Sequence, residues 1–217
     1  MYNLQIKNFA QMAEYQLTQK IIELSESDYW ETARREWVFE MIYVSEEPQT
    51  CLCGHFPIIN ICVIRNTKNE NNTEVGNCCI NKFLGINDGN KILPSINRLK
   101  EDLSKSMSLE SLDYLYDKNV ISQKEYDFYS DIQRKRNLSL KQSSFKESIN
   151  EKLLNFTSYE ANSIFAKINK ILKWAENRDD FDTDFVESLK HNCQRKGTLT
   201  NNQKLALDKI IKKFKIE

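Results

Sequence analysis

The stretch "CLCGHFPIINICVIRN" (residues 51–66) decides how this chain is organised. It places three cysteines within twelve residues, and two more follow together in "VGNCCINKFLG" (75–85). Zinc takes four nitrogen or sulfur ligands in a tetrahedron, so a site needs two short-range ligand pairs that a turn brings together. The Cys-x-Cys pair, a β-rich run, the polar turn "TKNENN" (67–72) and a short return strand supply that layout. The sequence therefore predicts a β-rich zinc module.

Four cysteines are the predicted ligands of a structural Zn²⁺: Cys51, Cys53, Cys62 and Cys79. Cys62 is expected near the far end of the first strand, opposite the bend at Gly76 that precedes Cys79. His55 and Cys78 are the alternates. His55 competes above all for the place of Cys62, whereas Cys78 does not easily coordinate beside Cys79 because adjacent side chains diverge. The structural alternative to zinc is a buried cluster of reduced cysteines.

The chain shows no feature of a membrane or secreted protein. No apolar run approaches the length that spans a bilayer, and "MYNLQIKNFAQMAEYQ" (1–16) lacks the apolar core of a signal peptide. We therefore expect a cytoplasmic protein. In that reducing compartment clustered cysteines are more often metal ligands than disulfides.

Charge is balanced overall and uneven along the chain. The 217 residues carry 31 basic and 31 acidic side chains, which argues against a uniformly basic protein that coats duplex DNA. Residues 1–50 carry nine acidic and four basic side chains, and residues 190–217 carry eight basic and two acidic ones. The sequence thus has an acidic front and a basic tail.

Glycine and proline mark the predicted domain boundaries. Four of five glycines and all three prolines fall between residues 48 and 94, and their absence elsewhere permits long helices. We predict N-terminal helices and a leading strand over residues 1–47, a zinc-binding hairpin and helix over 48–90, and a helical domain over 91–217. The expected fold is mainly α with a small β-rich zinc-finger module and a C-terminal helical bundle.

Two helices and a strand are predicted before the cysteines. "MAEYQLTQKIIEL" (12–24) has helical apolar spacing. "SDYWETARREW" (27–37) is expected to begin a second helix, with Ser27 as its N-cap. "WVFEMIYV" (37–44) is rich in aromatic and β-branched residues, which predicts a strand that ends at the "SEEPQT" turn.

After Pro94 a helix-start signal recurs. "KNVISQKE" (118–125), "KRNLSLKQ" (135–142) and "KGTLTNNQ" (196–203) each place Ser or Thr three residues before Glu or Gln, which is the pattern of a capping box. The segments around the last two copies are similar to each other. They favour helix-turn-helix-like repeats, although any helical bundle repeats capping boxes.

The segment "EWVFEMIYVSEEPQTCLCGHFPIINICVIRNTKNENNTEVGNCCINKFLG" (36–85) resembles a widespread, functionally uncharacterised group of small bacterial and phage zinc-finger proteins. The shared pattern is EW, a β run, CxCGHxPIxxxCxIxN, a variable turn and VGNxCxxxFLG, over about a quarter of the chain. The resemblance implies a zinc site at the four assigned cysteines and a mobile-element or phage-defence setting, without an activity. Cys78 occupies a variable position of the pattern.

The leading functional hypothesis is a non-catalytic zinc protein that contacts nucleic acid. Cations just before helix starts and in the C-terminal tail favour phosphate contacts, although Lys-rich helix faces are often only solvated. The predicted contacts are Arg134, Lys135, Arg136, Arg195, Lys196, Lys212 and Lys213.

The alternative is a protein–protein interaction adaptor stabilised by zinc, which the aromatic segments "YLYDKN" and "EYDFYSD" would suit. An enzyme is not expected, because the chain lacks common catalytic motifs and a four-thiolate site leaves no position for water. If His55 and a water replaced Cys62, Glu74 would be the candidate base. No small-molecule substrate is evident from the sequence.

Overall fold

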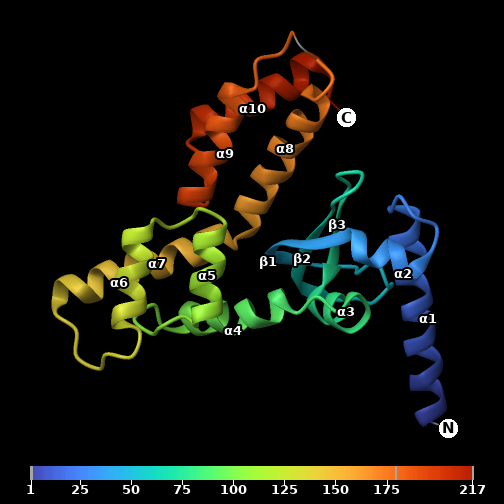
Figure 1. Cartoon of the computed structure of the whole chain (residues 1–217), viewed down its shortest axis with the longest axis horizontal. Coiled ribbons are helices and arrows are strands. Elements are labelled where there is room, and N and C mark those ends of the chain that lie inside the picture. The colour runs from blue at the N-terminus through green and yellow to red at the C-terminus, as the bar shows by residue number, and fades with distance from the viewer. Residues whose placement is uncertain (1, 179, 217) are drawn as a thin grey trace. The chain divides into compact units, whose positions relative to one another are not determined.

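A computed structural model describes residues 2–178 and 180–216 (Figure 1). The chain divides into two compact units, of which unit 1 ends at Leu93 and unit 2 begins at Pro94. Helices predominate, and the described residues contain one three-stranded antiparallel sheet. This confirms a mainly α protein with a small β-rich part. The helix-turn-helix-like repeat expected in the C-terminal region is not confirmed.

The units divide the chain differently from the predicted boundaries at 47/48 and 90/91. Strand β1 (Trp37–Gln49) passes through 47/48 and pairs with β2 (Ile58–Asn66), so the leading strand and the cysteine-rich segment share one sheet. Helix α4 (Asp88–Glu101) passes through 90/91 and contains Pro94.

Unit 1 begins with helix α1 (Tyr2–Glu23), which contains all but the last residue of the helix predicted at 12–24. The second predicted helix is only a short one, α2 (Trp30–Ala33), followed by a 3-10 turn, η1 (Arg34–Glu36). Ser27 is not its N-cap, since Tyr29 holds that position and makes no capping hydrogen bond. Strand β1 also continues beyond the predicted end, because "SEEPQ" stays extended with an irregular register.

The sheet of unit 1 has β2 at its centre. β1 and β3 (Asn72–Gly76) flank it, and both run antiparallel to it. The short helix α3 (Asn77–Cys79) and a π-helical turn, η2 (Ile80–Leu84), follow directly. Residues paired across antiparallel strands share a face, so Ile42, Cys62 and Val75 form one buried row.

The carboxylate of Glu36 fastens the segment after α1 to the start of the sheet. Only 5% of Glu36 is exposed, and its oxygens accept hydrogen bonds from the N–H groups of Glu26 and Ser27 at 2.8 and 3.0 Å. Asn66 Nδ2 donates a third at 2.7 Å. Burial alone would raise the pKa of Glu36, but these hydrogen bonds outweigh it and the pKa is lowered.

Unit 2 is helical. Its elements after α4 are α5 (Leu109–Asp117), α6 (Gln123–Ile132), α7 (Leu140–Phe156), α8 (Tyr159–Ala175), α9 (Asp184–Lys196) and α10 (Asn201–Phe214). The three predicted capping boxes are confirmed at Ser122, Ser139 and Thr200. In each, the hydroxyl of the N-cap residue accepts from the N–H of the N3 residue, and the N3 side chain accepts from the N–H of the N-cap residue.

Two buried polar side chains, Tyr129 and Asn150, form a hub that hydrogen-bonds to the backbone between α4 and α5. Asn150 on α7 is fully buried and donates to the carbonyls of Leu103 and Lys105 at 2.7 and 2.8 Å. It accepts from the Tyr129 hydroxyl at 2.6 Å, and that hydroxyl accepts from the N–H of Met107 at 2.8 Å. The Tyr129 hydroxyl and the Asn150 side-chain amide therefore both have hydrogen-bond partners, which is the condition for a polar group to be tolerated in a core.

No helix in the described part of the chain has the length and apolar character needed to cross a membrane.

We expect Glu36→Gln to lower the free energy of unfolding at pH 7 by about 1–3 kcal/mol, because a charged acceptor of three hydrogen bonds becomes a neutral one. The lowered pKa means that this stabilisation is present above the ordinary glutamate pKa of 4.5 and is lost as the pH falls through the lower folded-state value. Denaturant titrations from pH 7 to pH 3 should therefore show the wild-type advantage shrinking on acidification. Glu46→Gln, at an exposed position of β1, is the control. A constant difference across this range would contradict the assignment.

Candidate metal centre

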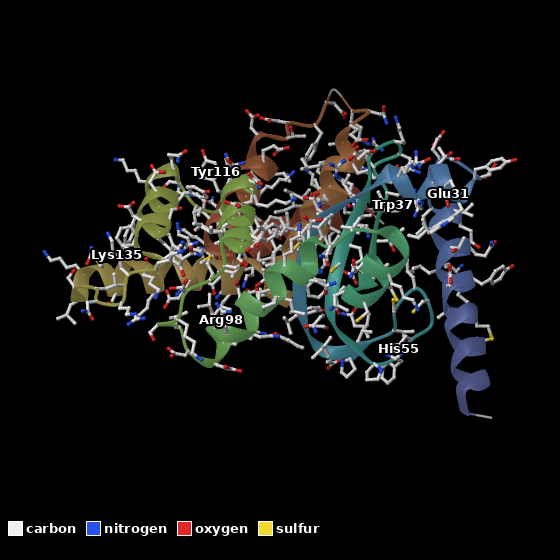
Figure 2. All side chains as sticks on the ribbon, turned by 60° about the horizontal axis from the view of Figure 1, so that its bottom comes forward. Glu31, Trp37, His55, Arg98, Tyr116 and Lys135 are labelled. Carbon is white, nitrogen blue, oxygen red and sulfur yellow. The ribbon has the colours of Figure 1, made fainter. Side chains whose placement is uncertain are left out.

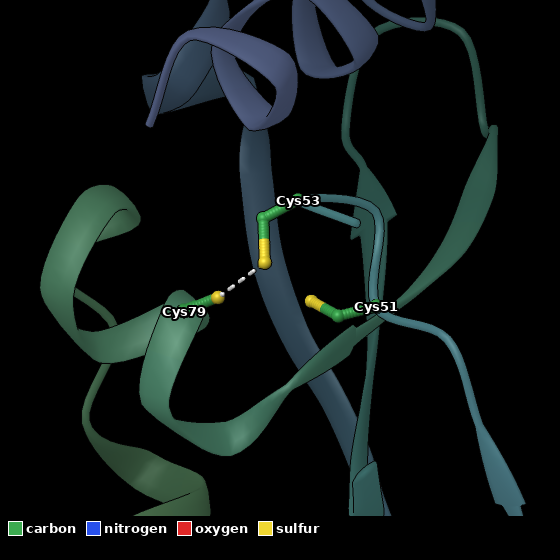
Figure 3. A group of neighbouring side chains, drawn as sticks. All are labelled: Cys51, Cys53 and Cys79. Carbon is green, nitrogen blue, oxygen red and sulfur yellow. Dashed lines mark hydrogen bonds between the residues drawn. The ribbon is translucent and has the colours of Figure 1, made fainter. Parts of the chain in front are cut away.

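Three cysteines of unit 1 converge on one point (Figure 3). Cys51 and Cys53 lie in the loop between β1 and β2, and Cys79 ends helix α3. Their sulfur atoms all lie within 4.8 Å of one another. Cys51 and Cys53 are buried and Cys79 is half-buried. Three of the four predicted ligands therefore form a cluster that can hold a metal ion.

The loop that carries Cys51 and Cys53 is a tight knuckle. Gly54 has a φ of +83°, in the left-handed region that favours glycine, and its N–H donates to the Cys51 carbonyl at 2.8 Å. The Cys51 N–H in turn donates to the His55 carbonyl at 2.9 Å. A Cβ at Gly54 would lie 2.6 Å from Gln16 Oε1 of α1, so glycine also permits this helix to approach the knuckle. The turn at Gly54 brings both thiols to the same side of the loop (Figure 3).

Hydrogen bonds to sulfur favour ionisation of Cys51. A hydrogen bond from the Cys79 thiol, and those from the N–H groups of Cys53 and Gly76, lower the pKa of Cys51 to about 5 against the opposing effect of burial. The Gly76 N–H lies 3.3 Å from the Cys51 sulfur. The sequence analysis missed this contribution of Gly76, because its place beside Cys51 depends on strand pairing.

The other two thiols favour the protonated form. Hydrogen bonding to Cys51 and burial raise the pKa of Cys79, and burial raises that of Cys53. The Cys79 and Cys53 sulfurs are 3.3 Å apart, with Cys79 as the donor. A bound cation would replace the protons that these thiols carry, since thiolates are the form that binds metal.

Cys62, the fourth predicted ligand, is not part of this cluster. Successive residues of a strand alternate between faces, and Ile61 rather than Cys62 pairs with Gly76. A Cβ on Gly76 would lie 3.7 Å from the Cys51 sulfur, which places the thiols on the Gly76 side. Cys62 instead contacts α4, because a Cβ on Gly89 would lie 2.6 Å from its sulfur. It is fully buried, and burial raises its pKa to about 12.

The two alternates, His55 and Cys78, are both exposed and lie outside the three-sulfur cluster. His55 belongs to the same knuckle as the first two thiols, and its backbone already closes that loop. Cys78 precedes Cys79 in α3, and the two neighbours differ in burial as expected for diverging side chains.

All seven predicted nucleic-acid contacts lie on the surface of unit 2, and Figure 2 shows Lys135 projecting from the ribbon. Arg134, Lys135 and Arg136 occupy the loop between α6 and α7, where the predicted helix start is confirmed. The other four cations lie in the last turns of α9 and α10. Cations at these ends also interact favourably with the helix dipole, which is a structural role.

Comparisons of the chain with protein-family models, with curated proteins and with solved structures find no match. The resemblance described from the sequence pattern therefore stays a prediction.

The Cys62–Gly89 contact predicts an energetic coupling between the two positions. We expect Cys62→Ala to cost about 1–2 kcal/mol through the cavity it leaves, and Gly89→Ala to cost about 1–3 kcal/mol through overpacking against the sulfur. The double variant should cost at least about 1 kcal/mol less than the sum, because the new methyl group fills the space of the removed sulfur. Denaturant unfolding of the four proteins measures this cycle. Additive effects would show that Cys62 and Gly89 do not pack together.

Proposed function

We propose that Cys51, Cys53 and Cys79 hold a structural zinc ion, and that His55 supplies the fourth ligand. The observation that carries this is the meeting of three sulfurs within 4.8 Å from two segments that are far apart in the sequence. Thiolates together with an imidazole are a common ligand set for structural zinc. His55 is favoured over Cys62 because it follows Cys53 in the same loop and its exposed side chain has room to turn, whereas Cys62 lies on the opposite face of the sheet.

Such an ion would link the knuckle to the end of α3. The knuckle itself contributes little apolar burial, because residues 54–57 are all exposed. A metal crosslink therefore substitutes for a hydrophobic interior at this end of the sheet. Four protein ligands leave no position for a reactive water, so this site supports a non-catalytic role.

We further propose that the chain acts in the cytoplasm by contacting nucleic acid through unit 2. Supporting this, none of the seven predicted contact residues forms an ion pair with any residue in the described part of the chain. Exposed cations without ion-pair partners are free to neutralise phosphates and release the counterions around them. The consecutive Arg134, Lys135 and Arg136 concentrate this charge in one loop.

A protein partner is the second candidate. Leu140, the first residue of α7, is 91% exposed beside the basic loop, and an exposed leucine suits a protein contact better than a phosphate contact. The two candidates differ in how binding responds to salt, because phosphate contacts weaken steeply with ionic strength.

Metal content tests the zinc proposal. We expect about one zinc per chain in the wild type and in Cys62→Ala, and loss of zinc in Cys79→Ser, because removing one of three sulfurs breaks the tetrahedral set. His55→Ala should bind at least tenfold more weakly in a chelator competition, as expected for loss of one ligand. Zinc retained in Cys79→Ser would refute the site. Zinc lost from a folded Cys62→Ala variant would return Cys62 to the ligand set.

Salt-dependent binding to a labelled oligonucleotide tests the nucleic-acid proposal. Replacing Arg134, Lys135 and Arg136 with glutamine should weaken binding and make the plot of log K against log salt shallower by about 2–3, because each lost phosphate contact removes about one from the slope. The matched control replaces three exposed lysines outside the proposed contacts, Lys91, Lys100 and Lys170, and changes the net charge equally. Equal losses of oligonucleotide affinity in the two triple variants would show that only the net charge matters, which would contradict a defined binding surface.

A further inference from the structure

Unit 2 contains a pocket of about 540 Å³ that neither the metal centre nor the basic loop accounts for. It is built by the loop between α5 and α6, the first turn of α6, and side chains of α7 and α9. Its apolar lining comes from Val120 and Ile121, which are 2% and 4% exposed, and from the ring of Phe145, which is 40% exposed. The pocket is large enough for a ligand of drug-like size, and its mixture of apolar and charged lining is typical of small-molecule sites.

The charge of this pocket is positive. Three cations line it, Lys124, Lys152 and Arg195, against one carboxylate, Glu125. Lys152 Nζ donates to Glu125 at 2.6 Å, so these two charges neutralise each other. Within the described residues, Lys124 and Arg195 have no ion-pair partner. Two cations therefore remain for a ligand.

Both oxygens of the Glu125 carboxylate are already engaged by other groups. One oxygen accepts from Lys152, and the other accepts from the N–H and the hydroxyl of Ser122 at 2.8 and 2.9 Å. The same capping box also uses the Ser122 hydroxyl to accept from the Glu125 N–H. The positive character of the pocket thus rests on side-chain cations and not on an open helix start.

We propose that this pocket binds a nucleoside monophosphate group, with the phosphate neutralised by Lys124 and Arg195 and the base placed against Phe145. Two cations match the double negative charge of a phosphate monoester, and arginine binds phosphate oxygens in a bidentate manner. An aromatic ring stacks on any base, so Phe145 gives affinity without sequence preference. The ring of Phe145 is held in place by Phe128, with ring centroids 4.7 Å apart.

The same chemistry has two sources, a free mononucleotide and the 5′-phosphorylated end of a strand. Binding of a strand end rests on the proposed nucleic-acid contact, because Arg195 belongs both to the predicted nucleic-acid contacts and to the pocket. Lys124 belongs to the pocket alone and so separates the two proposals.

The test is calorimetric titration of the full chain with adenosine monophosphate, adenosine and inorganic phosphate. We expect the monophosphate to bind at least tenfold more tightly than either part. Lys124→Gln and Arg195→Gln should each weaken it at least tenfold, and Phe145→Leu should remove most of the advantage over inorganic phosphate. Lys170→Gln, an exposed cation of α8 outside the pocket, should bind as the wild type does. Circular dichroism confirms that each variant is folded.

A second arm compares a short single strand with and without a 5′ phosphate. If the wild type prefers the phosphorylated strand and Lys124→Gln does not, a strand end is a ligand of the pocket. If the wild type binds the free monophosphate but shows no preference between the two strands, the ligand is the mononucleotide. If Lys124→Gln binds both the monophosphate and the phosphorylated strand as tightly as the wild type does, the pocket proposal is refuted. The proposed function would still stand if the basic-loop substitutions weaken oligonucleotide binding.

Discussion

The pairing of Ile61 with Gly76 decides the chemistry of unit 1, because it determines which cysteines meet. In this register the N–H of Gly76 donates to the Cys51 sulfur. Helix α3 follows directly after Gly76 and carries Cys79 to the other two thiols. A slip of one residue would exchange the faces of β2 and bring Cys62 to the thiol side. Burial opposes such a slip, because Cys62 and Ile64 are fully buried on one face of β2 and both would change faces. Hydrophobic packing on one face thus positions the thiol cluster on the other.

Local signals in the sequence predicted the parts of the structure that depend on near neighbours. The capping boxes at Ser122, Ser139 and Thr200 involve residues three apart, and all three are confirmed. The short spacing of Cys51 and Cys53 likewise requires only one turn. Their meeting with Cys79 was predicted from the hairpin between them, whose two strands are marked by β-branched residues and a polar turn.

The structure differs from the expectations where a long-range contact overrides a local pattern. The position of Cys62 depends on strand register, which spacing in the sequence does not fix, and its close partner Gly89 lies on a helix outside the hairpin. The helix predicted over residues 27–37 begins only at Trp30 and ends in a 3-10 turn. The N–H groups of Glu26 and Ser27, which precede it, are hydrogen-bonded to the Glu36 carboxylate, and so is the side chain of Asn66. Only the fold brings that asparagine, thirty residues away in the chain, beside the carboxylate.

The equal numbers of acidic and basic residues in the whole chain conceal an uneven distribution of charge along it, with acidic residues in excess over 1–50 and basic residues in excess over 190–217. In unit 2 several carboxylates are used internally, as in the pairs Glu125–Lys152 and Asp208–Lys167. Such pairs stabilise a surface only modestly, and each cancels one negative and one positive charge in the field that an approaching ligand meets. The exposed cations of the basic loop and of the pocket have no such partners among the described residues. A chain of zero net charge can therefore present a positive binding surface, because its basic and acidic residues are concentrated in different segments.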